Sequence, residues 1–171
     1  MRKRLFIALS AVVLLIAAAV GGIYWSKRNT FAVPDGWKEY RNERLGISFV
    51  YPGNWDTLDV AQYNEIWINN GDIPEPPPPD MLFLPMVVAV TKESSQKTFE
   101  RLSQQANSSF VEIAGRQISR LSFVSGPDKE ARILYIMSRS NDYLHIGIPV
   151  NRENTPEIQQ ILESLVQRSS R

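Results

Sequence analysis

The chain has 171 residues, of which 43% are hydrophobic and 22% are charged, with one histidine and no cysteine. This length is typical of one domain with short flanking segments. The composition excludes disulfides, zinc–thiolate sites and thiol nucleophiles, and a single histidine excludes any metal motif that needs two imidazoles.

Charge is distributed unevenly along the chain. All 18 Asp and Glu residues lie beyond residue 28, whereas five of the 19 Lys and Arg residues precede residue 29. Residues 29–171 therefore carry 14 basic against 18 acidic side chains, a net charge of −4. A domain of this sign lacks the basic surface that phosphate backbones need, so we expect no nucleic-acid partner.

The first segment, residues 5–25 (LFIALSAVVLLIAAAVGGIYW), contains no charged side chain. Its 21 residues would span about 31 Å as a helix, which matches a hydrocarbon core of about 30 Å. Three basic residues lie in the cytoplasmic segment 1–4 and only two follow the span, so the positive-inside bias places the domain outside the cytoplasm. A cleaved signal peptide ending near residues 17–19 is the alternative. The apolar run continues to Trp25, which favours a single-pass signal-anchor with the lipid bilayer as its partner.

A linker, residues 26–37, leads into the predicted domain at 38–168, and residues 169–171 form a frayed tail. Alternation of apolar and polar residues, with turn residues between the runs, is typical of strands in a half-buried sheet. Strands are expected at residues 38–44, 47–51, 57–63, 64–69, 82–91, 110–114, 116–125, 131–139 and 143–150. Short links between the last strands indicate a mainly antiparallel sheet.

Two helices are predicted. One fits residues 95–107, with Ser94 or Ser95 as its cap. The other begins with Thr155 as N-cap and Pro156 in the first turn. It carries one apolar stripe, Ile158, Ile161, Leu162, Leu165 and Val166. Because strand 82–91 is apolar on both faces, we expect helices on both sides of a central sheet, which gives an α+β three-layer α/β/α sandwich.

The stretch Trp37–Trp55 (WKEYRNERLGISFVYPGNW) resembles the opening of PsbP-like domains, in which Gly, an aliphatic residue, Ser, Phe, Tyr, Pro and Trp recur in this order. The similarity extends over residues 37–168. It implies an antiparallel sheet flanked by helices and a non-enzymatic role. Relatives include extrinsic subunits of photosystem II, a nuclear-import factor that binds a small GTPase, and exported bacterial proteins. The matching residues are structural, so the resemblance transfers no functional residue.

Few residues are candidates for chemistry. His145 is the single neutral-range base, on the strand face opposite Leu144 and Ile146, and no Gly-x-Ser-x-Gly elbow accompanies it. Asp56, Asp59 and Glu65 lack the spacing of a calcium loop. The sequence therefore predicts no catalytic residue, cofactor or metal site, and a hydrolase using His145 remains the enzymatic alternative.

A candidate partner surface follows from aromatic and proline content. Residues 69–80 (NNGDIPEPPPPD) predict a stiff extended loop between two strands, or else a ligand for an aromatic-groove module. The predicted surface consists of Trp67, Pro76, Pro77, Pro78, Pro79, Tyr143 and His145. We expect a membrane-anchored, extracytoplasmic, non-enzymatic binding or scaffolding domain of the cell envelope, whose partner is an envelope protein or a cell-surface polymer. A photosystem-type accessory subunit is the other alternative.

Overall fold

A computed structural model describes residues 31–73, 86–102, 106–125 and 130–169. Val33–Arg171 groups into one compact unit. The predicted membrane span at 5–25 and prolines 76–79 lie outside the described residues. Within the described ranges, no helix combines the length and apolar character that crossing a bilayer requires.

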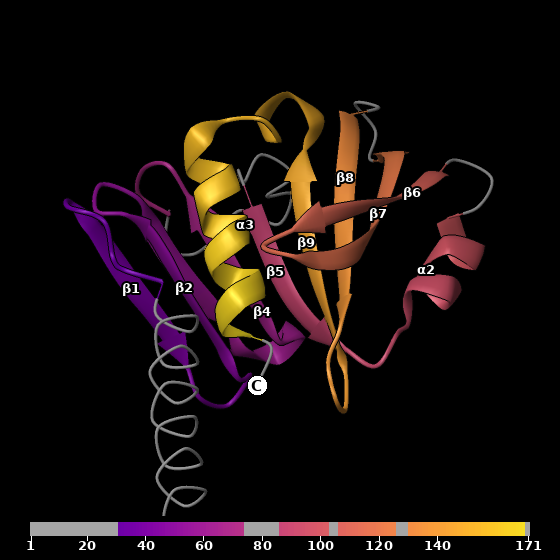
Figure 1. Cartoon of the computed structure of the whole chain (residues 1–171), viewed down its shortest axis with the longest axis horizontal. Helices are drawn as coiled ribbons and strands as arrows, with labels where there is room; N and C mark the ends of the chain where they lie inside the picture. The colour runs from indigo at the N-terminus through magenta and orange to yellow at the C-terminus, as the bar shows by residue number, and fades with distance from the viewer. Residues whose placement is uncertain (1–30, 74–85, 103–105, 126–129, 170–171) are drawn as a thin grey trace, which may run out of the picture. The chain divides into compact units, whose positions relative to one another are not determined.

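The main feature of the unit is a seven-stranded sheet in the order β3-β4-β5-β9-β8-β7-β6, in which every neighbouring pair is antiparallel. The chain builds β3 to β5 in sequence, crosses through α2 to the far edge, and returns through β6 to β9 (Figure 1). The elements are β3 (Asp56–Val60), β4 (Glu65–Asn69), β5 (Met86–Thr91), α2 (Ser95–Leu102), β6 (Ala106–Ile113), β7 (Arg116–Ser125), β8 (Glu130–Ser138) and β9 (Tyr143–Pro149). The predicted antiparallel α+β class is therefore confirmed.

A separate two-stranded sheet precedes it, formed by β1 (Trp37–Asn42) and β2 (Ile47–Pro52). The sequence predicted one sheet, and this part of the prediction is wrong. The edge of β2 that does not pair with β1 contacts helix α3 (Pro156–Arg168) instead of another strand. There the Val50 N–H donates to the buried hydroxyl of Ser164 at 3.0 Å.

The larger core lies between α3, the β1–β2 sheet and one face of the seven-stranded sheet. All five residues of the predicted apolar stripe of α3 are fully buried in it. Phe49 on β2 is also fully buried, and its ring stacks on Tyr40 with centroids 4.9 Å apart. Trp55 is partly buried and packs against this core.

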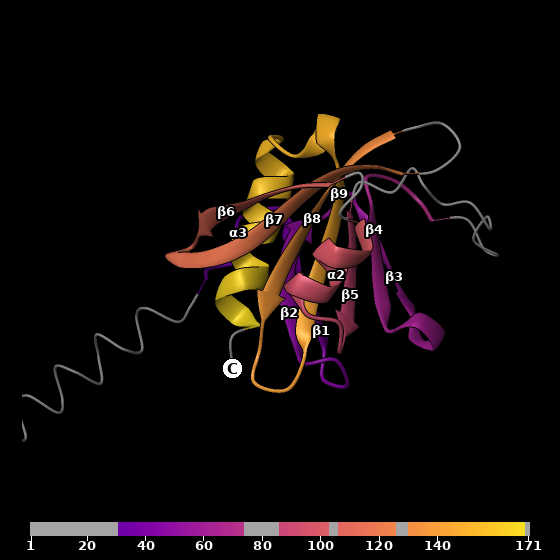
Figure 2. The ribbon, with the colours of Figure 1, turned by 90° about the vertical axis from the view of Figure 1, so that its right-hand side faces the viewer.

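The second face of the sheet is covered by α2. Figure 2 shows α2 in front of the central strands and α3 behind them, which is the expected three-layer order. Thr98 of α2 and the sheet residues Leu121, Ile136 and His145 are buried on this side. The cover is thinner than predicted, because α2 has only eight residues. Thus Val87 and Ala89 of β5 are only half-buried.

Several predicted boundaries are wrong. The helix expected at 95–107 does not include Ala106 and Asn107, which belong to β6 and pair with Phe123 and Ser122. Ser169, expected in a frayed tail, is 1% exposed. In both cases tertiary contacts decide the conformation, through strand pairing for β6 and through packing at the end of α3. Short 3-10 turns η1 (Ala61–Tyr63) and η2 (Val150–Arg152) replace the predicted ends of two strands.

Candidate functional site

His145, the one imidazole of the chain, lies on β9 and faces α2. It is 9% exposed. Its Nε2 is 3.0 Å from the carbonyl oxygen of Glu93, in the turn that enters α2. The Glu93 carboxylate in turn accepts a hydrogen bond from Nε of Arg101 at 2.9 Å. The contact therefore joins the middle of the sheet to the start of the covering helix.

The chemistry of this contact limits what His145 can do. A carbonyl oxygen only accepts hydrogen bonds, so Nε2 must carry the hydrogen. Burial lowers the pKa of His145, although the neighbouring Glu93 opposes that shift. The hydrogen bond from Arg101 lowers the pKa of Glu93. At neutral pH His145 is thus a neutral donor whose Nε2 is occupied, and only Nδ1 keeps a lone pair.

Trp67 and Tyr143, the other described residues of the predicted partner surface, lie on the same sheet face as His145. Trp67 of β4 pairs with Val87 of β5, and Val87 pairs on its other side with Gly147 of β9. Tyr143 of β9 pairs with Thr91 of β5. These positions are four residues apart along β5, or about 14 Å at the rise of a strand. Trp67 is half-buried and its indole N–H donates to Glu65 at 2.9 Å. The two aromatics therefore share one sheet face but lie at its opposite ends, with His145 buried on the row between them.

A polar cluster on the α3 side was not predicted. Arg120 of β7 binds the carboxylate of Glu153 through two hydrogen bonds of 2.7 and 2.9 Å, and the Tyr135 hydroxyl donates to the same carboxylate. The Arg120 hydrogen bonds lower the pKa of Glu153, and burial raises the pKa of Tyr135. Arg120 lies two residues after the buried Ile118 and therefore on the same inward-facing side of β7. A charged residue at such a position was the feature of the sequence that could have indicated this cluster. With its charge paired and its hydrogen bonds made internally, the cluster anchors the segment before α3 to the sheet.

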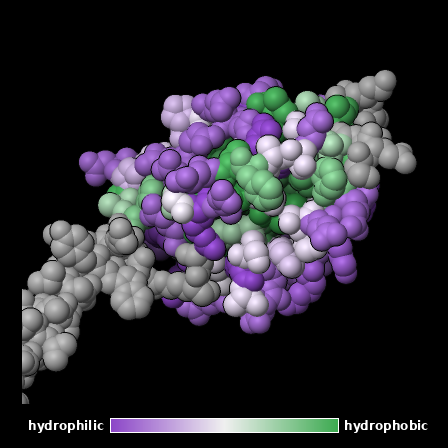
Figure 3. Space-filling view, turned by 45° about the vertical axis from the view of Figure 1, so that its right-hand side comes forward, coloured by the Kyte–Doolittle hydropathy of each residue, from purple (hydrophilic) through white to green (hydrophobic). Residues whose placement is uncertain are grey.

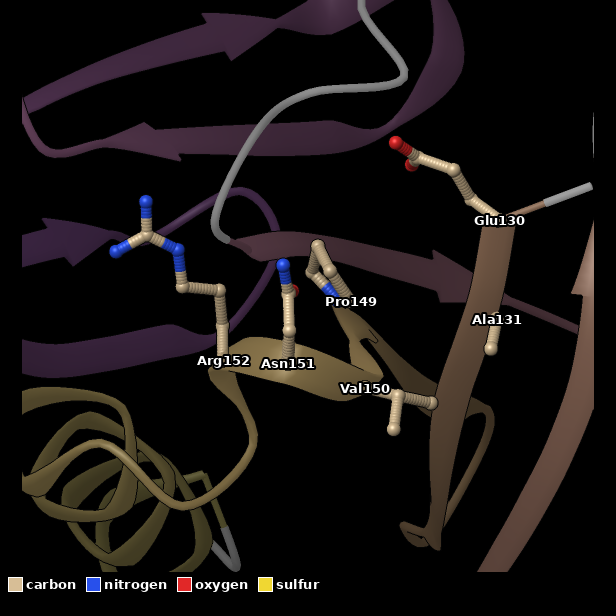
Figure 4. A pocket seen from close by; sticks show the side chains of 6 residues that line it. All are labelled: Glu130, Ala131, Pro149, Val150, Asn151 and Arg152. Atoms are coloured by element: carbon tan, nitrogen blue, oxygen red, sulfur yellow. The ribbon is translucent and has the colours of Figure 1, made fainter. Parts of the chain in front are cut away.

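One open pocket of about 540 Å³ lies beside this segment, at the start of β8 and the end of β9. Figure 4 shows Glu130 on one side of it and Asn151 and Arg152 on the other, with Pro149 between them and Ala131 and Val150 below. A carboxylate, an amide and a guanidinium are binding groups. No nucleophile–base pair lines this pocket.

A second pocket of about 540 Å³ lies where η1, β5 and the β8–β9 turn meet. Its charged lining is engaged internally: Arg44 donates to Asn64 at 2.6 Å and to Asp59 at 3.1 Å, and Asp142 accepts from Arg139. Across the described ranges, no group of three or more His, Asp or Glu side chains is arranged to hold a metal ion.

Comparisons with known proteins give distant matches. No protein-family profile and no curated protein matches the chain. Among solved structures, the chain is similar to one from Bacteroides thetaiotaomicron, with a TM-score of 0.49 and 12% identity over 74% of this chain. This chain covers 47% of that protein, about half its length.

A second similar structure is cyanobacterial PsbP (CyanoP) from Synechocystis, with a TM-score of 0.48 and 12% identity over 79% of this chain and 94% of that one. CyanoP carries the family name that residues 37–55 predicted.

Proposed function

We propose that this protein is a membrane-tethered, extracytoplasmic domain that binds or scaffolds another envelope component and performs no chemistry itself. The observation that carries the proposal is the position of His145. The chain has no other imidazole, and this one is buried with its Nε2 occupied by the Glu93 carbonyl. A hydrolase that used His145 as general base would need it within reach of a substrate.

The charged groups of the described residues support the same proposal. The carboxylates with lowered pKa values, Glu93 and Glu153, are each held by an arginine of the same chain. Active sites use perturbed groups that face a cleft, whereas these groups fasten secondary-structure elements to one another. These ion pairs thus fit a structural role, in which they hold neighbouring elements of the domain together.

The enzymatic alternative is tested with His145→Gln, whose amide N–H can replace the Nε2 donor toward Glu93 and so preserve the fold. We expect the full chain and this variant to hydrolyse activated ester and amide substrates equally slowly. We also expect both to capture the same neighbours when crosslinked in their native membrane and analysed by mass spectrometry. Hydrolysis by the unmodified chain that His145→Gln abolishes would overturn the proposal.

The tether and the location are tested by protease access. The uncharged run 5–25 and the basic residues before it support an anchor with the domain outside. We expect protease added to intact spheroplasts to remove a tag at the C-terminus. Without protease, we expect the tagged protein to stay with the membrane fraction after carbonate extraction. A tag that survives until the spheroplasts are lysed would contradict the proposed location.

A further inference from the structure

The terminal strands of the two sheets differ in how they are protected against pairing with another chain. An edge strand exposes unpaired backbone N–H and C=O groups, and natural proteins protect such edges with charges or short length. The edge strand β3 has five residues, and two of them, Asp56 and Asp59, are acidic. The edge strand β1 has six, of which Lys38, Glu39 and Arg41 are charged.

Strand β6 lacks this protection. It forms the other end of the seven-stranded sheet and is eight residues long (ANSSFVEI), with Glu112 as its one charge and no proline. Residues 107–110 are all exposed. Phe110 is 74% exposed, more than any other large hydrophobic side chain among the described residues. Figure 3 views the side on which α2 and the β6–β7 hairpin come forward, and it shows apolar side chains gathered at its centre with hydrophilic ones around them.

The β6–β7 hairpin is well formed, and no other described strand pairs with the outer side of β6. All eight residues of β6 pair with β7, from Ala106 with Phe123 to Ile113 with Arg116. Its two-residue turn, Ala114-Gly115, has positive φ at both positions, which matches the twist of a hairpin. At the turn end Ile113 is buried in the core, so the free part of the edge runs from Ala106 to Phe110. This edge is therefore preformed.

We propose that β6 pairs antiparallel with β6 of a second copy of this chain, so that two seven-stranded sheets join into one. The proposal deepens the proposed function, on which it rests, by naming one binding partner. A two-fold axis normal to the sheet keeps each residue of the second copy on the same sheet face as in the first. Residues that lie opposite each other in antiparallel strands also share a face. One residue of β6 must therefore lie opposite the same residue of the second copy. Placing Ser108, Ser109 or Phe110 there leaves Glu112 away from Glu112 of the second copy. Two copies of β6 can therefore pair without placing their like charges opposite each other.

The same geometry limits the assembly to two copies. Pairing of β6 with β6 uses one patch twice and leaves no further open edge of this kind among the strands that the structure describes, because β1 and β3 carry charges. A short strand-to-strand contact lies at the small end of specific interfaces. Attachment of both copies to one membrane would raise their effective concentration and favour the pair.

The test uses the absence of cysteine in the natural chain. Ser108→Cys on β6 and, as control, Lys38→Cys on β1 are each introduced into the full chain, reconstituted in lipid vesicles and treated with a short bis-maleimide. We expect Ser108→Cys to give a crosslinked dimer and Lys38→Cys to stay monomeric. Adding Phe110→Lys to Ser108→Cys should lower the dimer yield about tenfold, because a lysine on the edge opposes strand addition in each of these registers.

Val124→Lys, at another exposed hydrophobic residue away from the edge, is the matched control and should leave the dimer unchanged. Equal crosslinking of Ser108→Cys and Lys38→Cys, a ladder of larger oligomers, or a dimer insensitive to Phe110→Lys would overturn the inference. A purified chain that stays monomeric while crosslinking in native membranes captures a different protein would refute self-pairing and leave the binding function standing.

Discussion

Ser164 gives the sharpest test of how the β1–β2 sheet is held. Its side chain is fully buried, and its hydroxyl donates to the Ile161 carbonyl at 2.8 Å while it accepts the Val50 N–H at 3.0 Å. Ser164→Ala removes the acceptor and leaves a buried N–H without a partner, which costs about 1–3 kcal/mol. The better helix propensity of alanine returns about 0.5 kcal/mol. We therefore expect a net loss of about 0.5–2.5 kcal/mol in the free energy of unfolding.

The measurement is urea unfolding of the full chain in detergent, followed by tryptophan fluorescence. With an m-value of about 2 kcal/mol per molar urea, the midpoint should fall by about 0.25–1.25 M. Hydrogen exchange at the Val50 amide should also accelerate, because its hydrogen bond is lost.

Ser169→Ala is the matched control at the end of the same helix. The Ser169 hydroxyl is equally buried, but it has no hydrogen-bond partner among the described residues. Its removal should leave the midpoint unchanged or raise it. If Ser164→Ala unfolds at the same urea concentration as the unmodified chain, or if both variants lose the same stability, the hydroxyl does not hold β2 to α3.

Three further outcomes can be measured in the same way. Because burial holds the pKa of His145 below its usual value, the unfolded chain takes up this proton first as the pH falls. Stability that is present above pH about 6.5 should therefore be lost toward pH 5, and His145→Gln should flatten that slope; parallel slopes would contradict the burial argument. Glu153→Gln should lower stability by about 1.5–3 kcal/mol, since the guanidinium of Arg120 loses its charged acceptor, and an unchanged midpoint would show that solvent replaces the carboxylate. Ala114→Gly should raise stability by about 0.5–1 kcal/mol, because Ala114 has a φ of 50°, whereas Gly115→Ala in the same turn should lower it.

Local residue patterns were sufficient to predict the strands and helices whose apolar residues recur at a regular spacing. Strand β7 has the predicted bounds, and α3 begins at Pro156 with its apolar stripe fully buried. Such patterns can be read from the chain because a strand or helix shows its period of about 2 or 3.6 residues wherever one face must leave water. The antiparallel class followed from the short links between the last strands.

The pairing of backbone edges and of buried polar groups depends on contacts between segments that are distant in sequence. The free backbone N–H of Val50 in β2 meets a hydroxyl of α3 that lies 114 residues further along the chain. Ala106 continues the helical spacing of Phe99 and Leu102, yet it joins β6 because its backbone pairs with Phe123. For Arg120, local pattern shows an inward charge but not the carboxylate of Glu153 that stabilises it. The spacing of apolar residues indicates which side chains are buried. It does not indicate which distant segment supplies the hydrogen-bond partner of a buried polar group.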